Sequence, residues 1–361
     1  MSHQNFDKNF TANETAETET TVWYTTPGEP FEIYGLMPEK DGLLSRRMPL
    51  AYAETVSTGV AGQCGYGAGG RILFSTDSPY VALRVEYGAG VVHTVCNHCL
   101  CYGFDFYKVR EGREVFIAAC RPVAEFDYHR AEYKAQTWTN GEMTCFTLNF
   151  PNFSEVKALS IGLQKGSRLE KGRPYRNGKP VVFYGSSITH GAAAGRPGNA
   201  YPSFISQKYN LDYVNLGFAG KALGETVMAN YIASLDMCAF VCDFDHNANT
   251  VERLLTAHYR LYEIVRRSHP DIPYIIVTRP DYYPNEEKHS KLWAVIRDTY
   301  DRAIAAGDEN VYFVDGRHLF DGEFYDSCTS DGIHPNDLGF YRMAEKIGPV
   351  VAKALGIAEY R

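Results

Sequence analysis

Residues 181–189 read VVFYGSSIT, and this stretch decides the fold of the second half of the chain. Four apolar residues without polar interruption are typical of a parallel strand that is buried on both faces. The glycine and serines that follow allow a sharp turn into a helix. The stretch therefore predicts a buried strand over 181–184 that ends in a polar loop.

The same pattern recurs downstream. Short apolar runs predict four further buried strands, at 213–216, 239–243, 274–278 and 311–314. Helical periodicity is clearest in segments 251–265 and 343–355, where apolar residues recur at i, i+3, i+4 and i+7. Five β-α units in series predict a parallel, doubly wound sheet. Because ligands bind such sheets at the carboxyl ends of the strands, functional residues are expected there.

The first half of the chain, up to about Leu163, has an apolar period of two instead. Residues 81–87 and 146–150 alternate between apolar and polar side chains, and turn sequences such as Asn140-Gly141 separate such runs. Many short strands without a convincing amphipathic helix predict an antiparallel β-sandwich. A basic stretch rich in glycine and proline then indicates a linker. The predicted order is a polar tail (1–21), a β-sandwich domain (22–165), a linker (166–180) and an α/β domain (181–361).

Composition and charge exclude several classes of protein. The 361 residues are 45% hydrophobic and 22% charged, and no apolar run approaches the ~18 residues of a membrane helix. Lysines and arginines are scattered and the net charge is −7, so we expect neither nucleic acid nor a membrane as partner. Nine cysteines in a chain of this length are expected to be reduced thiols. They favour a cytoplasmic protein, as does the lack of a secretory signal, unless a leader has been removed.

Two further segments contain residue types that occur in binding sites. Cys96, Cys99 and Cys101, with His93 and His98, could bind zinc if a second ligand pair were available, and none is evident. We interpret the cysteines as buried thiols and predict no metal. The glycine-rich segment 62–70 lacks the Gly-Lys-Ser/Thr of a phosphate-binding loop and is interpreted as an ordinary loop.

Ser187 follows the first predicted strand of the α/β domain, at the start of a helix. A helix N-terminus favours developing negative charge, which suits a nucleophile, although a serine there can also simply cap the helix. Asp331 and His334 follow the fifth predicted strand, so one loop can present both side chains at the same end of the sheet. A serine hydroxyl needs a base, and the base needs a carboxylate partner. The alternative for this pair is a turn-forming Asp-Gly followed by a surface histidine.

Four blocks of the sequence resemble those of a known family. Residues 185–189 and 331–334 look like the first and last sequence blocks of SGNH/GDSL hydrolases, with a serine at 186 in place of the frequent aspartate. Residues 215–220 are similar to the second block, and 245–248 to an altered third block. The resemblance implies a flavodoxin-like, three-layer α/β/α domain, a hydrolase mechanism and no cofactor.

The resemblance also implies a role for each matching residue. Ser187, His334 and Asp331 would form the catalytic triad. The oxyanion hole would consist of the N–H groups of Ser187 and Gly220 and the side-chain amide of Asn247. Asn249 is the alternative to Asn247, because the third block is altered at its glycine.

The first half resembles a second element of the same family. Residues 103–107, GFDFY, look like the Gly-x-Asp-Leu-Tyr signature of a jelly-roll-like β-sandwich that precedes one lipase/acylhydrolase subgroup. Residues 196–198, followed by Ala200-Tyr201, are also similar to that subgroup. The matches therefore extend through both halves in the family's order.

The implied activity is hydrolysis of carboxylic esters. We expect a small-acyl, in particular acetyl, esterase whose substrate is a small molecule or a carbohydrate ester. The sequence is also compatible with a homo-oligomer. His190, Arg196 and Tyr201 are expected to line the substrate pocket, with packing at helix ends as the alternative. Further alternatives are a lipid acylhydrolase or thioesterase of the same fold, and a non-catalytic carbohydrate-binding protein.

Overall fold

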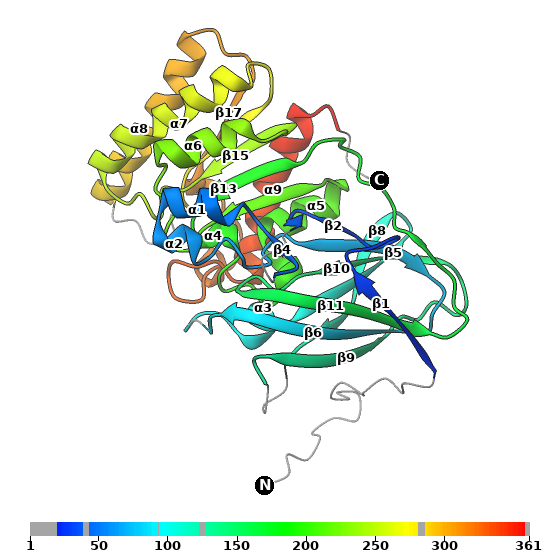
Figure 1. The fold of residues 1–361 in the computed structure, drawn as a ribbon. Coiled ribbons are helices and arrows are strands. Elements are labelled where there is room, and N and C mark those ends of the chain that lie inside the picture. The colour runs from blue at the N-terminus through cyan, green and yellow to red at the C-terminus, as the bar shows by residue number, and fades with distance from the viewer. Residues whose placement is uncertain (1–19, 39–42, 93, 123–126, 281–285, 358–361) are drawn as a thin grey trace.

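The computed structural model describes residues 20–38, 43–92, 94–122, 127–280 and 286–357. In the second half, a parallel sheet has the strand order β14-β13-β15-β16-β17 (Figure 1). Its strands lie within a residue or so of the predicted bounds: β13 Val181–Gly185, β14 Tyr213–Gly217, β15 Ala239–Asp243, β16 Tyr274–Val277 and β17 Val311–Val314. The order 2-1-3-4-5 is that of a flavodoxin-like sheet, so the predicted fold class is confirmed.

Helices cover both faces of this sheet. They are α4 Ser187–His190, α5 Tyr201–Tyr209, α6 Thr226–Ser234, α7 Val251–Ser268, α8 Glu286–Ala305 and α9 Asp337–Ala354. Val181 and Phe183 of β13 share a core with α5 and α9, whereas Val182 and Tyr184 share a core with α6, α7 and α8. Burial on both faces is the physical reason for the uninterrupted apolar runs.

Two antiparallel sheets make up most of the first half, as predicted for a β-sandwich. One has the order β1-β11-β6-β9, and the other has the order β12-β5-β10-β7-β8 with β2 paired to β5. The strands of the first are β1 Thr21–Thr26, β6 Tyr80–Gly90, β9 Arg130–Gln136 and β11 Ser154–Gln164. Those of the second are β2 Glu32–Tyr34, β5 Arg71–Thr76, β7 Phe104–Arg110, β8 Arg113–Cys120, β10 Thr144–Asn149 and β12 Leu169–Lys171. A two-stranded ribbon, β3 Met37–Pro38 and β4 Ser45–Arg46, completes this half.

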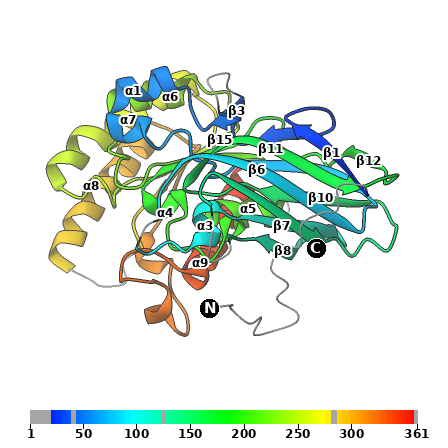
Figure 2. The same ribbon diagram turned by 60° about the horizontal axis from the view of Figure 1, so that its bottom comes forward.

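Three short helices also occur in the first half: α1 Leu50–Val56, α2 Thr58–Ala61 and α3 His98–Tyr102. They are too short to produce the repeated apolar stripe that sequence periodicity detects. Ala53 of α1 and Val60 of α2 are buried in the same core as α6 and α7. Accordingly, α1 lies beside α6 in both views (Figures 1 and 2). Part of the first half therefore packs onto the parallel sheet's helical layer.

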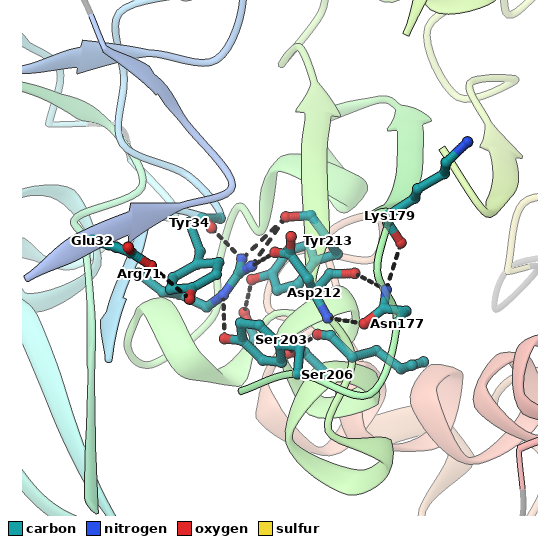
Figure 3. Close-up of polar contacts among 12 residues, drawn as sticks. Glu32, Tyr34, Arg71, Asn177, Lys179, Ser203, Ser206, Asp212 and Tyr213 are labelled. Atoms are coloured by element: carbon teal, nitrogen blue, oxygen red, sulfur yellow. Dashed lines mark hydrogen bonds and ion pairs between the residues drawn. The ribbon is translucent and has the colours of Figure 1, made fainter. Parts of the chain in front are cut away.

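The two halves are also joined through Arg71 of β5, which is 2% exposed (Figure 3). Its guanidinium is 2.5 Å from Asp212 Oδ1, donates to the carbonyl of Tyr213 at 3.2 Å, and lies 4.0 Å above the Tyr213 ring. Arg71 Nε also donates to the hydroxyl of Tyr175 at 2.8 Å. Burial alone would lower the pKa of Arg71. The two tyrosines and the Asp212 carboxylate outweigh this effect, so the pKa is raised. Arg71 is therefore a buried cation between the sandwich and β14.

The segment predicted as a linker, 166–180, contributes to both halves. Leu169–Lys171 forms β12 and pairs with β5. Further along, the Asn177 side chain accepts from the backbone N–H of Asp212 at 2.7 Å and donates to its carbonyl at 2.8 Å, beside Lys179 in Figure 3. The second part of this segment is thus fastened to the start of β14.

None of the helices in the described parts of the chain is both long and apolar enough to cross a membrane. All nine cysteines lie within the described residues and are free thiols.

Candidate active site

Ser187 is the first residue of α4, directly after β13. Ser186 is the N-cap, and its hydroxyl accepts from the backbone N–H of Ile188 at 3.2 Å. Gly185 is required before this turn, because a Cβ there would lie 2.0 Å from Thr189 Oγ1 and 2.2 Å from the carbonyl of Asp243. The cap is therefore the neighbouring serine, and the Ser187 hydroxyl is available for another role.

Asp331 and His334 share one turn before α9. Asp331 Oδ1 accepts from the backbone N–H groups of Ile333 at 3.0 Å and His334 at 2.8 Å. Gly332 between them has φ +84°, a left-handed conformation that favours glycine. The Asp-Gly pair thus does form a turn, and this turn presents both side chains on one side.

The three side chains form a hydrogen-bonded chain. Asp331 Oδ2 lies 2.8 Å from His334 Nδ1, and His334 Nε2 lies 3.0 Å from Ser187 Oγ. With the imidazole proton on Nδ1, the ring donates to the carboxylate and Nε2 accepts from the serine hydroxyl. This is the geometry that activates a serine nucleophile.

Hydrogen bonds keep the Asp331 carboxylate ionised. Burial alone would raise its pKa, but hydrogen bonds from the backbone and ring of His334 and from the Ile333 N–H lower it below its ordinary value. An ionised carboxylate next to Nδ1 stabilises the positive charge that the ring gains on taking a proton.

Gly220 and Asn247 lie beside Ser187 and line the same cavity. Gly220 has φ +69° and no atom within 4 Å of a would-be Cβ, so its backbone is held in a left-handed turn that is open to the cavity. Asn247 is anchored by a 2.9 Å hydrogen bond from its Nδ2 to the carbonyl of Phe218. Asn249 lies elsewhere: it lines a different hollow, and its Oδ1 accepts from Arg279. The geometry favours Asn247 over Asn249.

Residues of the first half hold the loop that contains Gly220. Arg47 is buried, donates to the carbonyl of Gly217 and to that of Gln63, and lies 4.6 Å from the Phe218 ring centroid. Gln63 in turn donates to the carbonyl of Ala219 at 2.9 Å. The segment that the sequence indicated only as a glycine-rich loop therefore positions a wall of the site.

The cavity around Ser187 has a volume of about 370 Å³. Its lining mixes both halves: Gln63, Tyr66, Val91 and Phe153 come from the first, and Ser187, Ala192, Ala219, Gly220, His246, Asn247, Ile333 and His334 from the second. Val91 follows β6 and Phe153 precedes β11, whereas Gln63 and Tyr66 lie in the loop between α2 and β5. The sequence does not reveal these four residues, because no local motif marks a residue that acts across a domain interface.

His246 is a further cavity residue that the sequence did not single out. Its Nε2 atom is buried, and no described residue forms a hydrogen bond with it. Burial, followed by the nearby Arg279 and His334, lowers its pKa well below the ordinary value, so the ring is neutral. Its position next to Asn247 in the altered third block was the one available signal.

His190, Arg196 and Tyr201 are not among the residues that line this cavity, which corrects the expectation of a pocket role. His190 is fully buried, stacks on Phe153 at 4.1 Å and places Nε2 2.7 Å from the carbonyl of Asn152. Tyr201 is also fully buried and donates to Asp243, the last residue of β15, at 3.2 Å. Both side chains therefore have the packing role at helix ends that was the alternative expectation, because His190 ends α4, Tyr201 begins α5, and both are buried.

Arg196 instead belongs to a contact between the two family signatures. Asp105 Oδ2 accepts from the N–H of Gly198 at 2.8 Å and lies 3.3 Å from Arg196 Nε, while Oδ1 accepts from Asn149 at 2.8 Å. The Tyr107 hydroxyl lies 3.3 Å from Arg196 Nε. Burial raises the Asp105 pKa to about 6, although these hydrogen bonds oppose the shift. The signatures at 103–107 and 196–198 therefore form one latch between sandwich and α/β domain.

The cysteine cluster lies around α3. Cys96 and Cys101 are buried and Cys99 is half-buried, and His93 lies outside the described residues. Among the described residues, no group of three or more His, Cys, Asp or Glu side chains could hold a metal ion.

Comparisons with known proteins identify the family of the chain. The sequence profile of the GDSL-like Lipase/Acylhydrolase family matches residues 178–352, and that of the GxDLY domain, the N-terminus of SGNH-hydrolase-type esterases, matches residues 21–169. None of the curated proteins compared with the chain matches it.

Solved structures resemble the chain over nearly its whole length. A protein described as a GDSL-like lipase from Bacteroides ovatus is 26% identical, with a TM-score of 0.83 over 94% of this chain and 100% of that one. The salicylyl-acyltransferase SsfX3 of a tetracycline biosynthetic pathway is 19% identical, with a TM-score of 0.75 over 94% and 99%. An acetyl xylan esterase from Butyrivibrio proteoclasticus is 13% identical, with a TM-score of 0.58 over 93% and 99%.

The α/β/α sheet with its N-terminal sandwich is that of an SGNH-type hydrolase of ester bonds. The chain belongs to the GDSL-like lipase/acylhydrolase family, in the form that begins with a GxDLY domain.

Proposed function

We propose that the protein is a serine esterase in which Ser187 is the nucleophile, His334 the general base and Asp331 the residue that orients and stabilises the imidazole. The observation that carries this proposal is the chain of hydrogen bonds from Asp331 through His334 to Ser187, at 2.8 and 3.0 Å, opening into a cavity. Position alone would allow Ser187 to be a helix cap, but Ser186 already fills that role.

The reaction is acyl transfer in two steps. Ser187 Oγ attacks the ester carbonyl while His334 Nε2 takes its proton and then passes that proton to the leaving alcohol. Water, deprotonated by the same nitrogen, attacks the acyl-enzyme, and the imidazolium returns this proton to Ser187 Oγ as the bond to the acyl group breaks and the acid is released. The N–H groups of Ser187 and Gly220 and the amide of Asn247 stabilise the oxyanion in both steps.

A small acyl group, in particular acetyl, is the proposed acyl part of the substrate. A cavity of about 370 Å³ is near the lower end of the range for small-molecule sites. Tyr66, Val91 and Phe153 give it an apolar wall, while His246 and Gln63 offer hydrogen bonds to the alcohol part. The acetyl xylan esterase among the similar folds supports a carbohydrate as that alcohol.

The test compares wild type with Ser187→Ala and, as a matched control, Ser234→Ala. Ser234 ends α6, and its hydroxyl donates to the carbonyl of Tyr231. A fluorophosphonate should label wild type and Ser234→Ala but not Ser187→Ala. Turnover of acetylated sugars and p-nitrophenyl acetate should fall by roughly 10⁴-fold or more in Ser187→Ala only.

Three results would contradict parts of this proposal. Undiminished labelling or turnover in a folded Ser187→Ala variant would refute the role of Ser187. Activity that rises with acyl length across p-nitrophenyl esters would replace the small-acyl assignment with a lipid acylhydrolase. Sugar binding without turnover in the wild type would indicate a non-catalytic binding protein.

A further inference from the structure

A second hollow lies at the end of the sandwich away from Ser187. It has a volume of about 520 Å³ and lies where β9 ends, β6 begins and β11 ends. The active-site residues Val91 and Phe153 stand at the opposite ends of β6 and β11. Because each of these strands has 11 residues, the hollow and the active-site cavity are roughly 35 Å apart. Figure 1 shows both strands running from the parallel sheet toward this far end.

Trp138 stands at the rim of the hollow and is 65% exposed. The other two tryptophans, Trp23 and Trp293, are only partly exposed. Trp138 also has φ +57°, a left-handed conformation that is costly for a side chain of this size. A strained backbone that holds a large ring in water needs surrounding structure to maintain it.

That structure consists of the two flanking threonines. The buried hydroxyls of Thr137 and Thr139 both donate to the carbonyl of Ser78, and Thr139 also donates to that of Asp77 at 2.9 Å. Lys108 Nζ donates to the carbonyl of Trp138 at 3.3 Å. Hydrogen bonds on both sides of Trp138 therefore hold the turn that carries the indole. A preorganised binding surface requires such a fixed backbone.

The rest of the lining is polar but nearly neutral. Gln136, Asn140, Gln164 and Ser167 contribute amides and a hydroxyl. Asp77 is compensated by Arg168, whose Nε lies 2.7 Å from its carboxylate. Lys165 adds one positive charge to the lining. Binding of an anionic polymer would need a cluster of such charges. An aromatic face beside neutral donors and acceptors matches a ligand with apolar C–H faces and many hydroxyls.

We propose that this hollow is a carbohydrate-binding site in which a sugar ring stacks on Trp138 and hydrogen-bonds to the neighbouring amides. The site is separate from Ser187 and goes beyond the esterase activity. It would hold a polysaccharide at one end of the sandwich while the other end faces the active-site cavity.

The test measures binding of unacetylated probes in a Ser187→Ala background, so that it stands whether or not Ser187 is the nucleophile. Cellohexaose, xylohexaose, soluble xylan, glucomannan and polygalacturonate are titrated by calorimetry and by tryptophan fluorescence. We expect a neutral saccharide to bind and to change the emission of the exposed indole. Trp138→Ala should weaken binding by roughly tenfold or more and abolish the emission change, while Trp138→Phe should retain part of the affinity.

Phe324→Ala is the matched control. Phe324 is 63% exposed with φ +60°, so it has the same exposure and backbone conformation as Trp138 but lies in the α/β half. This variant should bind as the parent does, and all variants should keep the parent's melting temperature within a few degrees. The proposal is overturned if no probe binds, if Trp138→Ala binds as tightly as the parent, or if Phe324→Ala loses binding equally.

Discussion

Asp331 uses its two carboxylate oxygens for different purposes. Oδ1 closes the turn by accepting two backbone N–H groups, and Oδ2 faces the ring of His334. The spacing of three residues is therefore a geometric requirement, because the same carboxylate builds the loop and orients the base. The Asp-Gly turn and the Asp331–His334 hydrogen bond, which the sequence presented as competing interpretations, therefore coexist in one structure.

Asn247 and Asn249 give a prediction at the same scale. Asn247→Ala should lower kcat by roughly 10²- to 10³-fold, since it removes the side chain proposed as an oxyanion donor, with little change in KM. Asn249→Ala, two residues away and outside the cavity, should change kcat by less than about threefold. Steady-state kinetics on p-nitrophenyl acetate measure both. If kcat fell equally in the two variants, the third block would contribute through the conformation of its loop and not through the Asn247 side chain.

At the scale of elements, the site depends on how closely strands and turns approach. A Cβ at Gly217, the end of β14, would lie 2.2 Å from the backbone nitrogen of His190, so this glycine lets α4 pack against the strand. The same holds at Gly198, where the turn after α4 meets the sandwich. Such close approaches explain why small residues stand at the ends of the elements that converge on Ser187.

Gly198→Ala tests the latch between β7 and this turn. The new Cβ would lie 2.4 Å from the Tyr107 hydroxyl and 2.8 Å from Asp105 Oδ2, both buried. Overpacking of this kind should lower the free energy of unfolding by about 1–3 kcal/mol, measured by urea denaturation. Gly178→Ala, with no atom within 4 Å of the new Cβ, is the control and should stay within about 0.5 kcal/mol of wild type. An unchanged free energy of unfolding in Gly198→Ala would show that the latch accommodates the extra methyl group, and the prediction would be wrong.

At the scale of the whole molecule, the first half completes the cavity around Ser187. Arg47 and Gln63 hold the loop of Gly220, and Tyr66 and Phe153 wall the cavity. Arg71 and Asp105 fasten the two halves through buried charges. The α/β half by itself therefore lacks part of the lining of this cavity.

Arg71→Ala should destabilise the whole protein. Removing the cation leaves the largely buried Asp212 carboxylate without its partner, which typically costs about 3–5 kcal/mol. Chemical denaturation followed by circular dichroism provides the measurement. Lys179→Ala removes an exposed ion pair with Asp236 and should cost less than about 1 kcal/mol. A loss for Arg71→Ala no larger than that of Lys179→Ala would show that Arg71 does not couple the halves.

Asp105 predicts a pH dependence of stability. Its folded-state pKa of about 6 lies above its ordinary value of 3.8, so the folded protein binds this proton more tightly than the unfolded chain. Stability from this group is therefore complete below about pH 4 and is lost as pH rises through about 6, by an amount on the order of 3 kcal/mol. Unfolding free energies between pH 4 and 7 should fall more in wild type than in Asp105→Asn. Parallel profiles in the two proteins would exclude Asp105 as the source.

The sequence by itself determined the order of the five parallel strands along the chain, the two-sheet character of the first half, and the positions of Ser187, Asp331 and His334. These features are local: buried strands produce continuous apolar runs, and catalytic motifs occupy strand ends. Tertiary structure alone decided that Tyr66, Val91 and Phe153 line the cavity, that His190 and Tyr201 do not, and that Asp105 meets Gly198. Such contacts join residues that are far apart in the chain, and their side chains are placed by packing between sheets, which no local pattern records.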